Sequence, residues 1–378
     1  MRPVPSSAAG RPLRVGIDGR ELEGRPTGVG RYLRSLLRRF AENDRHRFVI
    51  YSSSPVTLPV ESKGFELRVL RGSHPFLWEQ RTLPSALRED RIDVLFAPAY
   101  SCPLFASVPR VTAIHDLSFF ARPEEFGFTH GVRRRAMARW SARVSRSILA
   151  FSEFTKGEIL RRLGDSAARK TAVIFHGKDD DLPAGPGREA ARAALGLEES
   201  AAYIITVGTV LRRRNVSALV RAVAALRAQR PGVRLGIIGE NRSHPFEDLG
   251  ELARTLGAER EIRISGFVSD EEIVRHYAAA DVAVFLSEYE GFGLPALEAM
   301  SRGVPTIIAD RGSLNELFAV GTLVTEPEEG AVAGTLARVL NDPGTSAELR
   351  RRGLERARSF SWERAAQETL RVLEEAGQ

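Results

Sequence analysis

The chain has 378 residues, of which 43% are apolar and 27% charged, which is the composition of an ordinary globular protein. At roughly 100–200 residues per domain, this length favours two domains. Its single cysteine, Cys102, excludes an internal disulfide, and no apolar run approaches the roughly 18 residues of a membrane helix. Because residues 1–12 also lack the apolar segment of a secretory signal, we expect a cytoplasmic protein.

The net charge of +7 is distributed unevenly along the chain. Residues 1–180 hold 31 Lys and Arg against 19 Asp and Glu, a balance of +12, whereas residues 181–378 hold 24 against 29, a balance of −5. A basic half attracts phosphate groups, nucleic acid or an anionic membrane surface. Arginine-rich codon usage would explain the preference for Arg over Lys, but not the difference between the two halves.

In the first half, β-branched runs alternate with helical stretches, which predicts an α/β architecture with a parallel sheet. Gly28 and Gly30 form a loop before an amphipathic helix predicted over residues 30–42. By itself a single Gly-x-Gly is weak evidence for dinucleotide binding, because the full glycine fingerprint is absent. The predicted strands of this half are 13–18, 47–53, 65–70, 93–98, 110–116, 147–152 and 171–176.

The strand at 110–116 ends in His115 and Asp116, at the carboxyl edge of the sheet where the sites of α/β proteins lie. A histidine at a strand end is equally compatible with a structural role. Farther along, residues 130–147 predict an arginine-rich amphipathic helix that carries Trp140. One face of this helix fits an anionic membrane. A solvated face on a helix that packs over the sheet fits equally well, and the sequence leaves both interpretations open.

Residues 178–200 are rich in proline, glycine and acidic residues, and they predict a linker followed by a short helix. A second alternation of strands and helices follows and ends in two helices, at 345–358 and 362–376. Two Rossmann-like domains with a cleft between them are the natural packing of this pattern, with ligands at the carboxyl ends of the strands. The predicted strands of this half are 202–208, 233–239, 261–267, 281–287, 305–310 and 322–325.

The segment 207–215, VGTVLRRRN, leads from a strand through Gly208 and Thr209 to a helix that begins near Asn215. Arg213 and Arg214 stand just before that helix. They form either a solvated basic run or a binding site for an anion, because guanidinium groups bind phosphate bidentately.

The segment 287–310, SEYEGFGLPALEAMSRGVPTIIAD, places Glu290 and Glu298 on either side of a glycine-rich turn. Glycines let the backbone turn sharply and approach a ligand, and the proline after Leu294 suits the first turn of a helix. The start of such a helix offers free N–H groups and a partial positive charge to a phosphate. Glu298 lies one turn into the helix, where its carboxylate can accept hydrogen bonds from a ribose diol. Each acid alone is compatible with a solvated surface role, but their occurrence together with this turn favours a ligand site.

This segment resembles the E-x7-E signature of retaining glycosyltransferases with the GT-B fold, the large family 4 of nucleotide-sugar-dependent enzymes. The resemblance covers nearly all of the chain. Arg213, Arg214 and Asn215 align with an Arg-Lys-Asn triplet of that family, and Arg214 departs from it by replacing a point charge with a planar fork. The sequence TGVGRY around Gly28 and Gly30 is similar to the family loop that closes on the donor phosphate and sugar. This form occurs in members that transfer mannose and related sugars in surface-polysaccharide assembly.

The resemblance implies an α/β GT-B fold with three parts. These are an acceptor-binding Rossmann-like domain over 1–180, a nucleotide-sugar-binding one over 181–360, and a helix over 361–378 that packs back toward the first domain. It implies catalytic roles for His115, Arg213, Arg214 and Glu290, with the arginines stabilising the departing diphosphate, Glu290 orienting the sugar and His115 positioning groups. The expected donor contacts are Gly28, Gly30, Gly208, Thr209, Phe267, Val268, Phe292, Gly293, Leu294 and Glu298.

The expected reaction transfers a hexose, with GDP-mannose favoured over UDP-hexoses, to a glycan or a polyprenyl-diphosphate-linked acceptor. The family precedent is front-face attack, in which the leaving phosphate takes the acceptor proton. Phe267 and Val268 would frame the base. We expect no cofactor, no nucleic acid and no catalytic metal, and we interpret the Asp-x-Asp match at 179–181 as part of the linker. The place of action is cytoplasmic, with a peripheral position on the inner membrane face as a further expectation.

Two other function classes compete with this interpretation. A nucleotide or nucleic-acid binding protein without catalysis would not need both acids and both basic residues. A dinucleotide-dependent oxidoreductase would need a full glycine fingerprint with an acid about 20 residues farther on, and no strand–helix junction of this sequence supplies it.

Overall fold

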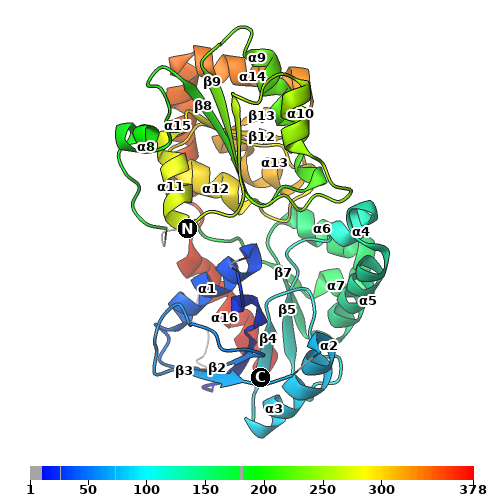
Figure 1. The fold of residues 1–378 in the computed structure, drawn as a ribbon. Helices are drawn as coiled ribbons and strands as arrows, with labels where there is room; N and C mark the ends of the chain where they lie inside the picture. Colours follow the sequence, from blue (N-terminus) through cyan, green and yellow to red (C-terminus); the bar gives the residue numbers. More distant parts are fainter. Residues whose placement is uncertain (1–10, 26, 73, 179–181) are drawn as a thin grey trace.

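The computed structural model describes residues 11–25, 27–72, 74–178 and 182–378. Two parallel sheets, each covered by helices, lie one above the other and form the two domains of the molecule (Figure 1). This confirms the predicted α/β fold with two Rossmann-like domains. The Asp-x-Asp match at 179–181 lies outside the described residues.

The first domain contains a seven-stranded sheet in the order β3-β2-β1-β4-β5-β6-β7. Every strand predicted in this half is present, and all but β1 stop one to three residues earlier, because the chain turns away at the carboxyl edge of the sheet. The strands are β1 (Arg14–Asp18), β2 (Arg47–Ser52), β3 (Phe65–Val69), β4 (Val94–Ala97), β5 (Arg110–Ala113), β6 (Ser147–Ala150) and β7 (Thr171–Val173).

Helices and single turns connect these strands. The longest two are α1, which follows β1, and α5, which lies beside α4 and the edge of β5. The elements are η1 (Arg20–Leu22), α1 (Gly28–Phe40), α2 (Pro75–Leu77), the π-turn η2 (Trp78–Thr82), α3 (Leu83–Glu89), α4 (Ser118–Ala121), η3 (Pro123–Glu125), α5 (Phe128–Val144), α6 (Glu153–Leu163) and α7 (Asp165–Arg169).

Helix α1 begins two residues earlier than the sequence predicts. Its start is fixed by Thr27, whose hydroxyl accepts a hydrogen bond of 2.9 Å from the backbone N–H of Gly30. The apolar face of α1 is fully buried against the sheet, with its leucines and Phe40 in the core. Burial of that face therefore holds the amino end of α1 at the carboxyl edge of β1.

The second domain contains a six-stranded sheet in the order β10-β9-β8-β11-β12-β13. The chain winds outward from β8 on one side and from β11 on the other, so the loops after these two strands meet at a topological switch point, where ligands of such folds bind. The strands are β8 (Ala202–Val207), β9 (Val233–Ile238), β10 (Ile262–Ser265), β11 (Val282–Phe285), β12 (Thr306–Ala309) and β13 (Leu323–Thr325).

The helices of the second domain cover both faces of its sheet (Figure 1). They are α8 (Arg188–Ala194), η4 (Arg212–Arg214), α9 (Val216–Leu226), α10 (Leu249–Thr255), α11 (Asp270–Ala279), α12 (Leu294–Ser301), α13 (Gly312–Phe318), η5 (Ala319–Gly321), α14 (Glu329–Asn341) and α15 (Pro343–Ala357).

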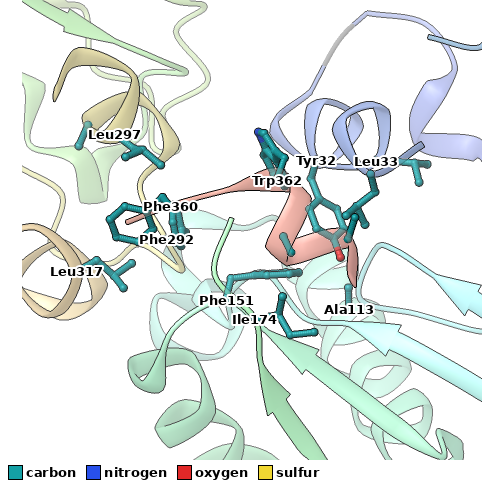
Figure 2. Close-up of a cluster of buried hydrophobic side chains, with 14 of the residues drawn as sticks. Tyr32, Leu33, Ala113, Phe151, Ile174, Phe292, Leu297, Leu317, Phe360 and Trp362 are labelled. Carbon is teal, nitrogen blue, oxygen red and sulfur yellow. The ribbon is translucent and has the colours of Figure 1, made fainter. Parts of the chain in front are cut away.

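The last helix, α16 (Trp362–Gly377), returns to the first domain and packs against α1 and the strands β4, β5 and β6 (Figure 1). At its start, Trp362 joins a buried aromatic cluster that draws on both domains. Figure 2 shows Tyr32 of α1, Phe151 and Trp362 on one side of this cluster and Phe292 and Phe360 on the other. The two domains therefore share one hydrophobic core at their junction.

Helix α5 differs from the predicted amphipathic helix. Its buried residues are small (Gly131, Ala138, Ser141 and Ala142), whereas Phe128 and Trp140 are 83% and 55% exposed. Close packing against the first domain selects small residues on the inner face and leaves the large apolar side chains outside among the arginines. In the part of the chain that the structure describes, no helix has the length and apolar character needed to cross a membrane.

Candidate functional site

A cavity of about 1030 Å³ lies between the carboxyl edges of the two sheets. In the first domain its walls come from α2, η2, α5 and the segments after β1, β4 and β5, and in the second from the segments after β8, β10 and β11. Most of the residues that the sequence singles out line it. These are Gly28, His115, Gly208, Thr209, Arg214, Phe267, Val268, Glu290, Phe292, Gly293, Leu294 and Glu298.

The loop between β11 and α12 packs directly against the first domain. A Cβ atom on Gly291 would overlap the carbonyl oxygen of His115, so only glycine fits this contact. Gly293, which precedes α12, has a φ of +104°, and a Cβ there would lie 2.5 Å from Leu314. These two glycines bring the free N–H groups at the start of α12 to the cavity wall.

Side chains from both domains hold this loop in place. The hydroxyl of Ser152 in the first domain donates a hydrogen bond of 2.7 Å to the carbonyl of Gly291. From the second domain, the hydroxyl of Ser313 donates one of 2.6 Å to the carbonyl of Glu290. Because the carbonyls point away and are satisfied, the loop can turn its N–H groups and the Glu290 side chain toward the cavity.

Glu290 and Arg214 form an ion pair on the cavity wall, with 2.8 Å between Arg214 Nε and Glu290 Oε1. The hydroxyl of Ser287 donates to the same carboxylate oxygen at 3.0 Å, and Arg214 Nη1 donates to the carbonyl of Thr209 at 3.1 Å. Gly208 has a φ of +117°, and its missing side chain leaves the space that the Arg214 guanidinium occupies. A fixed cation therefore stands beside the start of α12.

Glu298 is 4% exposed and lies where α12 faces α1 of the first domain. Its carboxylate accepts hydrogen bonds from Arg31 Nη1 at 2.6 Å and from the Tyr277 hydroxyl at 3.2 Å. Arg31 Nη2 also donates to Asp270 at 2.7 Å. The sequence analysis missed Arg31, although it directly follows Gly30 in the first turn of α1.

His115 is a neutral group in this site. Burial lowers its pKa to about 4, and its Nε2 lies 2.8 Å from the carbonyl oxygen of Pro98. Because a carbonyl can only accept, Nε2 carries the proton and Nδ1 is left as an acceptor. The neighbouring Asp116 lines the cavity and accepts a hydrogen bond from the backbone N–H of Ser118.

Two of the predicted residues do not line the cavity. Arg213 instead donates to Glu125 of the first domain at 2.8 Å. Burial lowers the pKa of Arg213, but the carboxylates of Asp116, Glu290 and Glu125 outweigh it and raise that pKa overall. Gly30 is buried, and a Cβ there would lie 2.5 Å from the carbonyl oxygen of Glu21, so this glycine permits close packing. Its neighbours Thr27 and Gly28 line the cavity in its place.

Phe267 and Val268 lie on the loop after β10 and line the cavity at the edge of the second domain. Phe267 is 56% exposed, and the guanidinium of Arg25 lies 5.9 Å from the centre of its ring. This wall thus offers an accessible aromatic face beside the backbone of the loop.

The first domain contributes further charged residues that the sequence analysis did not name. Asp18 ends β1, Arg20 begins η1, Glu79 lies on η2 and Arg134 on α5, and all four line the cavity. Asp18 ends a predicted strand, so the rule that found His115 would also have found it. Glu79 carries no such signal. Within the described residues, no group of three or more His, Cys, Asp or Glu is arranged to hold a metal ion.

Two family profiles match the chain, one described as Glycosyl transferases group 1 over residues 187–360 and one as Glycosyltransferase Family 4 over residues 26–182. O-antigen chain mannosyltransferase B of Escherichia coli is 30% identical over 365 residues, which cover 91% of this chain and 95% of that protein. D-inositol 3-phosphate glycosyltransferase of Kineococcus radiotolerans is 31% identical over 251 residues, 61% of this chain and 57% of that protein.

Solved structures share the fold over nearly the whole chain. Sucrose-phosphate synthase from Thermosynechococcus elongatus has a TM-score of 0.77 at 20% identity, covering 96% of this chain and 98% of that one. Anabaena HepE in complex with UDP and glucose has a TM-score of 0.76 at 20% identity, covering 96% of this chain and 100% of that one. At these identities the likeness concerns the fold.

Proposed function

The chain belongs to the GT-B glycosyltransferases, and on this basis we propose that it is a retaining enzyme that moves a hexose from a nucleotide sugar to a glycan or a lipid-linked glycan. The observation that carries the proposal is the convergence of Arg214, the start of α12 and the start of α1 on one cavity. Three fixed sources of positive potential aimed at one place suit a diphosphate that gains negative charge as it leaves.

The other residues of the cavity each contact a different part of the donor. Glu290 accepts hydroxyl hydrogens of the hexose, and its ion pair with Arg214 holds the carboxylate in place. Glu298 accepts from the ribose diol, which then shares the carboxylate with Arg31. Phe267 and Val268 frame the base. Nδ1 of neutral His115 accepts a hydroxyl hydrogen and so positions sugar or acceptor, while the leaving phosphate takes the acceptor proton in a front-face attack.

Mannose is the favoured hexose because O-antigen chain mannosyltransferase B aligns with nearly the full length of both chains. A structural neighbour was solved with UDP and glucose, so UDP-hexoses are the second choice of donor. The acceptor is a glycan or a polyprenyl-diphosphate-linked glycan. The exposed Phe128 and Trp140 on the basic helix α5 would bring the first domain to an anionic membrane, which sedimentation with phosphatidylglycerol vesicles would test.

The test is transfer or hydrolysis of GDP-mannose and UDP-glucose by the purified protein. Replacing Arg214 by Ala should lower kcat by about 10²–10³, as loss of one preorganised donor does in other enzymes. Arg214→Lys should keep part of the activity because the charge remains. Arg242→Ala is the matched control, since Arg242 pairs with Glu240 on the surface of the same domain. Retention is read from the anomeric configuration of the product.

A folded protein that neither shifts its Tm with any nucleotide sugar nor turns one over would contradict the proposal. Binding without turnover would instead favour the non-catalytic nucleotide-binding protein.

A further inference from the structure

The cavity is larger than the donor half described above, and its remaining wall in the first domain has a chemistry of its own. Asp18 at the end of β1, Arg20 at the start of η1, Glu79 on η2 and Phe76 on α2 line this wall. We propose that these residues form the acceptor subsite and that they bind the hydroxyl groups of a neutral sugar. This inference rests on the proposed function and deepens it by naming the class of acceptor.

Arg20 holds the two carboxylates of this wall together. Its Nη2 lies 2.5 Å from Asp18 Oδ2 and 3.3 Å from Glu79 Oε2, and its Nε donates to Asp18 Oδ1 at 3.0 Å. The guanidinium also lies 4.7 Å from the centre of the Trp78 ring, which backs it from the core. The one cation of the cluster is therefore committed to its own carboxylates and is not free to bind an anionic ligand.

Glu79 is the residue that indicates a bound ligand. It is 6% exposed, yet it lines the cavity, and its Oε1 has no hydrogen-bond partner among the described residues. A buried carboxylate oxygen without a partner costs free energy unless a bound group donates to it. Burial raises the pKa of Glu79, and the charge of Arg20 and a hydrogen bond from the Ser101 side chain offset this rise in part. A ligand hydroxyl would supply the missing donor.

The charges on this wall favour hydroxyl groups over phosphate. Asp18, Glu79 and the adjacent Glu21 provide three carboxylates against Arg20 and Arg134, so the balance of charge on this wall is negative and disfavours an anionic group. Hydroxyl groups donate to carboxylates, and an exposed aromatic ring such as Phe76, which is 41% exposed, covers the apolar face of a sugar. Glu21 also accepts from the Thr27 hydroxyl at 3.1 Å, which joins this wall to the start of α1 and thus to the donor half.

An anionic acceptor would bind elsewhere in the same cavity. Arg134 of α5 also lines the cavity, 5.8 Å from the centre of the Tyr100 ring, and its charge offsets in part the rise that burial causes in the pKa of Glu21. A phosphorylated sugar would pair with Arg134 and would not depend on Glu79. A neutral acceptor should therefore bind less well to the Glu79→Gln protein, and a phosphorylated acceptor should bind less well to the Arg134→Ala protein.

The experiment measures transfer from GDP-mannose, or from UDP-glucose if that is the working donor, to methyl α-mannoside and a panel of neutral methyl glycosides. Mannose 6-phosphate is the anionic probe. Glu79→Gln keeps the shape of the side chain, and we expect it to raise the acceptor KM about 10-fold or more while donor KM and donor hydrolysis change less than about twofold. Phe76→Ala, at an exposed position with little risk to folding, should raise the acceptor KM as well. Glu66→Gln is the control, because Glu66 is an exposed acid of the same domain that pairs with Arg14.

Three results would overturn the inference while leaving the proposed function intact. The first is a folded Glu79→Gln protein with an unchanged acceptor KM. The second is a preference for mannose 6-phosphate that Arg134→Ala abolishes and Glu79→Gln does not. The third is a wild-type protein that hydrolyses the donor but accepts no neutral glycoside. Absence of both donor hydrolysis and donor binding in the wild-type protein would instead contradict the proposed function itself.

Discussion

Gly291 is the residue where one domain meets the backbone of the other. We predict that Gly291→Ala lowers the free energy of unfolding by about 1–3 kcal/mol, because the new methyl group overlaps the His115 carbonyl and the loop must shift. Donor turnover should fall at least about 10-fold, since the same shift moves Glu290. Urea denaturation and initial rates measure the two effects.

Gly157→Ala is the matched control for that change. Gly157 lies within α6 with no atom within 4 Å of an added Cβ, so alanine should raise the free energy of unfolding by about 0.5–1 kcal/mol. Equal stability of the Gly291→Ala protein and the wild type would show that the two domains stand farther apart in solution.

His115 makes stability depend on pH in a defined window. Because burial lowers its pKa to about 4 while the unfolded chain titrates near 6.5, the unfolded state binds an extra proton between these values. The free energy of unfolding therefore falls as the pH drops from 6.5 toward 4, by at most about 3 kcal/mol from this ring.

Urea unfolding at about pH 7 and pH 5 checks this expectation. His115→Gln should show a smaller loss of stability on acidification than the wild type, and His74→Gln, at an exposed position, should match the wild type. The same acid dependence in both variants would mean that other groups set it.

Residues also show where prediction from the sequence stops. The sequence indicated Arg213 and Arg214 equally, but the structure turns only Arg214 to the cavity, because Glu125 of the other domain captures Arg213. Such a partner, 88 positions away in the chain, is set by tertiary packing and leaves no local pattern. Glu290 and Glu298 were predictable because their spacing around a glycine turn is itself local.

At the scale of elements, every predicted strand is present, because β-branched runs between glycine-rich turns are a strong local signal. Helix α5 shows the opposite case. The sequence predicted an amphipathic helix over residues 130–147, but the residues that α5 buries are small, because α5 lies close to α4 and β5. The π-turn η2, which carries Glu79, has no sequence pattern that would set it apart from the neighbouring helices.

Helix α16 should stabilise the first domain, although it is distant from that domain in sequence. Trp362 is 2% exposed and stacks on the buried His176, with 5.3 Å between ring centres. We predict that Trp362→Ala lowers the free energy of unfolding by about 3–5 kcal/mol, because it leaves a large cavity.

Chemical denaturation followed by circular dichroism measures this change. Trp362→Phe should cost less, since most of the volume is kept, and Arg371→Ala, on the exposed face of the same helix, should stay within about 0.5 kcal/mol of the wild type. A loss in Trp362→Ala no larger than that of the control would show that α16 is dispensable for the core.

At the scale of the whole molecule, some of the bonds that hold the domains together lie outside the cavity. Glu316 of α13 accepts hydrogen bonds from the backbone N–H groups of Glu153 and Phe154 at 2.9 and 2.7 Å, and so caps α6 of the other domain. We predict that Glu316→Ala opens the molecule and raises the donor KM about 3- to 10-fold, because one exposed pair of bonds contributes about 1 kcal/mol.

Small-angle scattering should show a larger radius of gyration for the Glu316→Ala protein. Glu326→Ala is the control, since Glu326 pairs with Arg311 inside the second domain. A raised donor KM in the Glu326→Ala protein, or an unchanged radius of gyration in the Glu316→Ala protein, would show that donor binding does not depend on how tightly the domains close.

The return of α16 has a consequence for how the protein is made on the ribosome. The second domain lies within the chain between β7 and α16, so its strands and helices can assemble before α16 has been translated. The surface of the first sheet that Trp362 and Leu373 cover stays open throughout that interval. The first domain is therefore translated first but completed last. We expect chaperones to matter most while the nascent chain still exposes this apolar surface.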